Sequence, residues 1–107
     1  MRIDSVDFIK IDVEGAEMNV LKGMHEISNS NKNLVMIMEL WPHGLRRAGT
    51  ELELLWYELL RLGFKDIYLL DEKIHEAIMV NLVEIKQRRE LRKGRDGASV
   101  NLLCKKA

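Results

Sequence analysis

The stretch from Asp7 to Glu17, DFIKIDVEGAE, constrains the fold more than any other part of the chain. Residues 8–11, FIKI, are rich in β-forming side chains and lie between two aspartates, which is typical of a strand buried on most of its surface. Gly15 suits a tight strand-to-helix turn, and helix-forming residues follow it. The stretch therefore predicts a strand that runs directly into a helix, with carboxylates gathered at the corner between them.

The rest of the chain continues this alternation of strands and helices. Continuous apolar runs predict strands at residues 34–38 and 64–70 and a last strand at residues 100–104. Because a helical crossover separates the first two strands, we expect them to be parallel in an α/β sheet. Parallel open sheets bind ligands beyond the carboxyl ends of their strands. Asp12 and Glu39 both stand at such ends, where a functional site is expected.

The helices are predicted from apolar spacing and from turn residues. The first begins at Ala16 and has a suitable C-cap at Gly23. Thr50 and Glu53 have the spacing of a capping box at the start of a second helix, which ends at Gly63. Its apolar stripe consists of Leu52, Leu55, Trp56, Leu59 and Leu60. A further helix is predicted from Ile74, Ile78, Leu82 and Ile85, and loops are predicted at residues 28–33, 40–49 and 95–99.

Length and composition exclude several classes of protein. With 107 residues, the chain is expected to form one small domain. Its 17 Lys and Arg residues balance its 17 Asp and Glu residues, so charge favours neither nucleic acid nor a membrane surface as a partner. No apolar run approaches the roughly 20 residues of a membrane-spanning helix. Cys104 is the only cysteine, which is typical of a reducing, cytoplasmic compartment.

Several of these segments together resemble one known family. The run KIDVEGAE at residues 10–17, the LKG that follows at residues 21–23 and the run LVMIMEL at residues 34–40 resemble the C-terminal half of FkbM-like S-adenosylmethionine-dependent methyltransferases. The closing NLLC, residues 101–104, resembles the last strand of that family. The resemblance covers nearly the whole chain, and its first motif is the specific one.

The resemblance implies a fold and a domain boundary. The family's Rossmann-like sheet has seven strands with helices on both faces, and this chain resembles strands 4, 5, 6 and 7 with their flanking helices. Such a half is mostly parallel with an antiparallel last strand. The glycine-rich turn that approaches the cofactor in the family has no counterpart in the sequence. We therefore expect residues 1–107 to be a single partial methyltransferase-like domain that lacks the N-terminal cofactor-binding half.

The resemblance also implies a function and the residues that carry it. The function is transfer of a methyl group from S-adenosylmethionine to an oxygen atom of a small molecule or glycan. Asp12 and Glu14 are implied to bind the cofactor at the rim of the donor site. Glu39 and His43 are implied to face the acceptor as catalytic residues, and Trp41 is implied to bind substrate.

Each of these residues also has a structural interpretation. Carboxylates at a strand–helix corner favour the positive end of the helix, whatever else they do. Glu39 equally suits a solvated strand end, or a hard divalent cation held together with Asp12 and Glu14, but no fourth ligand is evident and no metal is expected. His43 fits an exposed loop, and Trp41 fits a cover over the strand end. The role of Glu17 stays open, and Cys104 is most simply a small buried apolar residue.

Two other classes of function remain as alternatives. In the first, the chain is a non-catalytic half-domain or truncated fragment that acts as an interaction module and is inactive by itself. Its Phe8–Asp12 strand would then present an open edge through which two copies associate. In the second, the basic run KQRRELRKGR at residues 86–95 binds RNA, although a solvated helix face is the simpler interpretation because no aromatic residue is interleaved with it.

Overall fold

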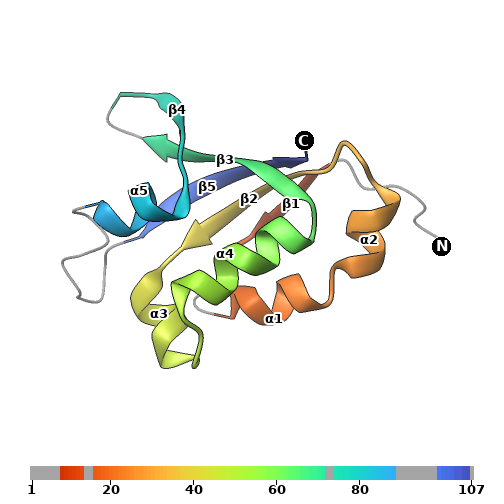
Figure 1. Cartoon of the computed structure of the whole chain (residues 1–107), viewed down its shortest axis with the longest axis horizontal. Coiled ribbons are helices and arrows are strands. Elements are labelled where there is room, and N and C mark those ends of the chain that lie inside the picture. The colour runs from red at the N-terminus through yellow and green to blue at the C-terminus, as the bar shows by residue number, and fades with distance from the viewer. Residues whose placement is uncertain (1–7, 14–15, 72–73, 89–98, 107) are drawn as a thin grey trace.

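The computed structural model describes residues 8–13, 16–71, 74–88 and 99–106, and these residues form a mixed α/β fold (Figure 1). No helix within these ranges is long and apolar enough to cross a membrane. The strands are β1 (Phe8–Ile11), β2 (Val35–Leu40), β3 (Phe64–Asp71), β4 (Glu76–Met79) and β5 (Val100–Lys106). The helices are α1 (Glu17–Lys22), α2 (His25–Ser30), α3 (Pro42–Arg47), α4 (Leu52–Arg61) and α5 (Leu82–Gln87).

The described strands form one five-stranded sheet in the order β1-β2-β5-β3-β4. The parallel pairing of β1 with β2 is confirmed, with Ile11 opposite Met38. The last strand is antiparallel to both of its neighbours, as expected. β1, β2 and β3 run in the same direction, which agrees with the expectation of mostly parallel strands and an antiparallel last strand. β5 separates the parallel strands β2 and β3, and β4 folds back on β3 as a hairpin, so the other three pairings are antiparallel.

The core lies between the sheet and the helices, with buried side chains from α1, α3, α4 and α5, and Figure 1 shows α4 in front of the strands. Along β2 the side chains alternate, because successive residues of a strand point to opposite faces. Met36, Met38 and Leu40 are fully buried on the helix-covered face, while Val35, Ile37 and Glu39 are only partly buried. Apolar alternation therefore determines which face of the sheet the helices cover.

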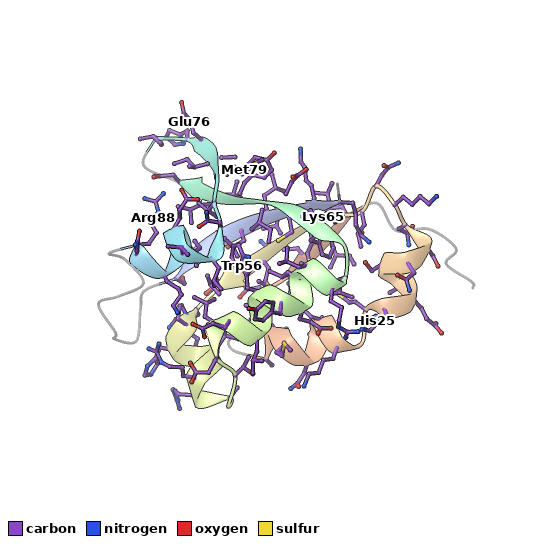
Figure 2. The ribbon with its side chains drawn as sticks, in the orientation of Figure 1. His25, Trp56, Lys65, Glu76, Met79 and Arg88 are labelled. Atoms are coloured by element: carbon purple, nitrogen blue, oxygen red, sulfur yellow. The ribbon has the colours of Figure 1, made fainter. Side chains whose placement is uncertain are left out.

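Helix α4 confirms the predicted apolar stripe at Leu55, Trp56 and Leu59, which are buried (Figure 2 labels Trp56), but not at Leu60, which is 40% exposed. Leu55 and Leu59 are 0% exposed, whereas Leu54 on the same helix is 54% exposed. The predicted capping box at Thr50 and Glu53 is wrong, because the N-cap is Glu51 and no side chain caps the helix there. The N3 position then falls on leucine, which cannot return a hydrogen bond. A capping box does occur at α5, where Asn81 and Glu84 exchange hydrogen bonds of 2.8 and 3.0 Å.

Three further segments differ from the sequence-based prediction. The helix predicted across residues 74–85 is instead β4 followed by α5, because Ile78 pairs with Leu69 in a hairpin that helical spacing does not reveal. The predicted loops at residues 28–33 and 40–49 contain the end of α2 and all of α3. Most of the predicted turn at 95–99 and of the basic run at 86–95 lies outside the described residues.

Truncating the buried stripe of α4 should destabilise the protein. We expect Leu55→Ala and Leu59→Ala each to lower the free energy of unfolding by about 2–5 kcal/mol, because each leaves a cavity in the core. Chemical denaturation measures this, with Leu54→Ala as a matched control whose side chain is mostly exposed. Equal losses in all three variants would mean that α4 does not pack on the sheet in this orientation.

Candidate functional site

The carboxyl ends of β1 and β2 bring two of the predicted site residues together. Because Ile11 lies opposite Met38 in a parallel pairing, the next residues, Asp12 and Glu39, are neighbours at the carboxyl ends of these strands. Ile11 and Met38 are buried in the core, whereas Asp12 is exposed and Glu39 is partly buried. The core thus anchors the two strand ends and leaves their carboxylates accessible.

The surroundings of Glu39 favour its protonated form. Partial burial, then the hydrogen bond and negative charge of Asp12, and then the charge of Glu17 all raise the pKa of Glu39 above its ordinary value of 4.5. A hydrogen bond from Ser99 acts in the opposite direction, because it stabilises the ionised carboxylate. Asp12 and Glu39 therefore form a carboxyl pair in which a proton is held more readily than on an isolated glutamate.

The third described carboxylate of the corner, Glu17, has a structural role. It is 1% exposed and is the first residue of α1. Its Oε2 accepts a hydrogen bond of 3.2 Å from the backbone N–H of Val13, which ties the start of the helix to the end of β1. Glu14 and Gly15 lie outside the described residues.

Trp41 and His43 form a second pair, where β2 leads into α3. The centroids of their rings are 5.7 Å apart, and the ring planes are inclined by 52°. The indole ring lies so close over Gly44 that a Cβ atom at that position would be 2.2 Å from its Cε3 atom. A side chain at residue 44 would therefore displace the indole. The Trp41 Nε1–H group is buried without a hydrogen-bond partner among the described residues.

Sequence reasoning missed three residues of this region. Ser99 forms a hydrogen bond with Glu39, and Asn101 lies directly opposite Glu39 across the β2–β5 ladder. Ser99 and Asn101 are far from Glu39 in the sequence, so no local pattern predicts that they lie close to it. Gly44 is different, because a glycine two residues after the only proline is visible in the sequence, although its contact with Trp41 is not.

Two other chemistries receive no support from the described residues. Within them, no group of three or more His, Cys, Asp or Glu side chains is arranged to hold a metal ion. Cys104 is fully buried, and burial raises the pKa of its thiol to about 12. The thiol therefore stays protonated at neutral pH, which confirms its interpretation as a small buried apolar residue.

Comparison with known proteins links this geometry to a family. The family model for the Methyltransferase FkbM domain matches residues 2–65, which is more than half of the 107-residue chain. The matched span contains both strand ends that carry Asp12 and Glu39, as well as Trp41 and His43. No curated protein and no solved structure matches the chain.

The raised pKa of Glu39 has a consequence for stability. A carboxyl group whose pKa is higher in the folded state favours folding when protonated, and this contribution is lost as the pH rises through the folded-state pKa. Glu39→Gln, which stays neutral, should therefore be more stable than the wild type at pH 7 and equally stable at a pH well below 4.5. Chemical denaturation at both pH values checks this, with the exposed Glu26→Gln as control. A loss of stability at pH 7 would contradict a pKa of Glu39 that burial and Asp12 raise in the folded state.

Proposed function

The chain belongs to the FkbM methyltransferase domain family, and from this premise we propose that it takes part in S-adenosylmethionine-dependent methyl transfer to an oxygen atom of a small molecule or glycan. The observation that carries the proposal is the carboxyl pair of Asp12 and Glu39 within the matched span. It lies at the carboxyl ends of two parallel strands, which is where open α/β sheets bind their ligands.

The described residues fit one side of a donor site. S-adenosylmethionine supplies the methyl group as an electrophile, and its ribose hydroxyls and amino group are hydrogen-bond donors. Asp12 is exposed next to the end of β1 and offers carboxylate oxygens as acceptors for such donors. We assign Asp12 to the donor rim, and we keep Glu14 there on the family resemblance alone, since it lies outside the described residues.

The acceptor side is assigned to the residues at the end of β2. Glu39, whose pKa is raised, would receive the proton that the acceptor hydroxyl loses, while Asp12 and Ser99 set its protonation and orientation. Trp41 would contact the acceptor, and its buried Nε1–H would find there the acceptor atom that the described residues do not provide. His43, beside Trp41, would be a second group for proton transfer or for positioning the hydroxyl.

The topology supports this assignment. In the family's sheet the strands follow the order 3-2-1-4-5-7-6, with strand 7 antiparallel. We infer that β1, β2, β3 and β5 correspond to strands 4, 5, 6 and 7, because the order β1-β2-β5-β3 with an antiparallel β5 matches 4-5-7-6. In that sheet β1 is an inner strand, whereas it is an edge strand of the described sheet. The donor site would therefore be completed by a further segment or chain that pairs with β1.

The open edge of β1 also favours a second candidate function, that of a non-catalytic interaction module. Phe8 is 52% exposed, and Lys10 is the charged residue within the strand, so the edge is weakly protected against pairing with another chain. In this alternative, two copies associate across Phe8–Asp12 and methyl transfer does not occur. Light scattering detects such association, and binding of the methyl donor distinguishes the two functions.

Titration of S-adenosylmethionine tests the proposed function. We expect weak binding to the chain alone, with a dissociation constant above the low micromolar range, because one side of the ligand stays in water. Amide signals of Ile11–Val13 and Glu39–Trp41 should shift in nuclear magnetic resonance spectra. Asp12→Asn should weaken the shifts, whereas Asp66→Asn on β3 should not.

Two outcomes would contradict parts of this account. If the amide signals of both strand ends do not shift, the methyl donor does not bind at the carboxyl ends of β1 and β2. The interaction module would then be the better function. A low micromolar or tighter dissociation constant would show instead that the chain forms a complete donor site by itself, so that no partner for the β1 edge is needed.

A further inference from the structure

A cavity of about 350 Å³ with a different chemistry lies at the opposite end of the strands, near the start of β3 and the end of β5. We call it the basic pocket. Four of its eight lining residues are cations and none is a carboxylate. The segments that form it precede β2, join α4 to β3 and end β5, so it lies away from the carboxyl ends of β1 and β2. Lys32, Arg61, Lys65 and Lys106 line it together with Ser28 and Gly63.

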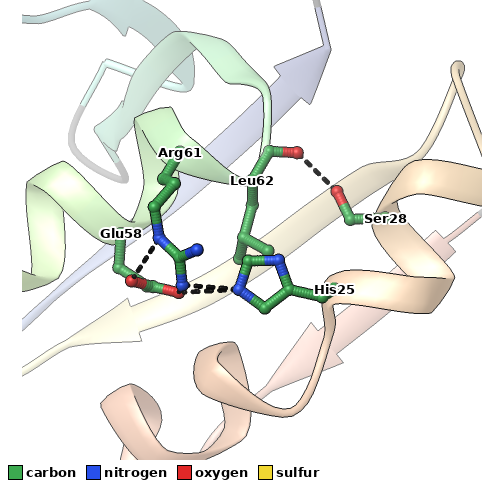
Figure 3. A network of polar contacts seen from close by, with 5 residues as sticks. All are labelled: His25, Ser28, Glu58, Arg61 and Leu62. Carbon is green, nitrogen blue, oxygen red and sulfur yellow. Dashed lines mark hydrogen bonds and ion pairs between the residues drawn. The ribbon is translucent and has the colours of Figure 1, made fainter.

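Lys106 is held in the pocket by the ends of two helices. Its Nζ donates hydrogen bonds to the carbonyl oxygens of Ser28, at 2.9 Å, and Leu62, at 2.7 Å. The Ser28 hydroxyl donates a second hydrogen bond of 2.5 Å to the Leu62 oxygen (Figure 3). Helix-terminal carbonyls normally repel an anion. Here the two carbonyl oxygens accept hydrogen bonds from Lys106 and Ser28, so they repel an anion in the pocket less than unpaired carbonyls would.

Gly63 leaves room for the lysine. Its φ angle is +98°, a left-handed conformation that favours glycine. A Cβ atom at this position would lie 2.9 Å from Nζ of Lys106 and 3.2 Å from its Cδ. A larger residue would thus be strained and would push against the ammonium group. The backbone conformation and the position of Lys106 depend on each other.

Arg61 is oriented by neighbouring side chains, as Figure 3 shows. Its Nη2 lies 2.6 Å from Oε1 of Glu58 and its Nε lies 3.2 Å from Oε2, and His25 contacts the same Nη2 from the other side. Lys32 and Lys65 are exposed and have no ion pair with a described residue. Glu58 balances the charge of Arg61, and the three lysines of the pocket leave it with a net positive charge.

We propose that the basic pocket binds a phosphate or diphosphate group of a soluble ligand. Three lysines around one cavity match the several negative oxygens of such a group, and an oriented arginine adds directional hydrogen bonds. Leu62 is the one large apolar residue among the lining residues, and no aromatic side chain is present there to stack on a base. The group is therefore recognised by its charge. Burial lowers the pKa of Lys106, and a bound anion would offset that cost.

Inorganic pyrophosphate is a suitable probe for this site. Titration at constant ionic strength, followed by nuclear magnetic resonance, should shift the amide signals of residues 28–32, 63–65 and 106 in a saturable manner. The double variant Lys32→Gln/Lys65→Gln should bind at least about tenfold more weakly, because it loses two charge-assisted contacts. Its matched control is Lys22→Gln/Arg47→Gln, which removes two exposed cations outside the pocket.

The controls decide whether the pocket is a specific site. Equal weakening in both double variants, or small shifts spread over the whole chain without saturation, would overturn the proposal. A second outcome would also overturn it. If the protein sediments with phosphatidylcholine vesicles that contain phosphatidic acid but does not bind pyrophosphate, the ligand is a membrane headgroup and not a soluble phosphate. Circular dichroism spectra equal to that of the wild type show that the variants remain folded, which is expected because all four substituted residues are exposed.

Discussion

The described structure depends on the pairing of β5 with two strands at once. β5 lies between β2 and β3, and its backbone hydrogen bonds connect the parallel pair β1–β2 to the hairpin β3–β4. Leu102 and Cys104 on this strand are fully buried against the helix layer. Both ladders join residues far apart in sequence, so their formation carries the entropy cost of closing long loops. Without β5, the described sheet would separate into two two-stranded pieces, each of marginal stability.

The same strand takes part in both candidate sites. Ser99, just before β5, forms a hydrogen bond with Glu39, and Asn101 lies opposite Glu39 in the ladder. At the other end of the strand, Lys106 lies in the basic pocket. A strand of seven residues spans roughly 23 Å at about 3.3 Å per residue. The acidic and basic regions thus lie at opposite ends of β5, which keeps the charges of the two sites well apart.

The sequence contains the local features of this fold but few of the long-range ones. β1, β2 and α4 were predictable because apolar runs and helical spacing act within a few residues, and Asp12 and Glu39 were predicted to converge because both end parallel strands. β4 was missed because its pairing with β3, and not its own spacing, makes it a strand. The partners of Glu39 and the basic pocket are set by the register of β5, and no spacing in the sequence encodes that register.

Native-state hydrogen exchange tests the central position of β5 most directly. If β5 holds the two parts of the sheet together, the backbone amides of Leu102, Leu103 and Cys104 should exchange only through global unfolding. Their exchange free energies should then equal the free energy of unfolding from chemical denaturation, and exchange in the edge strands β1 and β4 should be faster. Faster exchange of the β5 amides than of those in β1 and β2 would contradict this account, because the parallel pair would then be stable without β5.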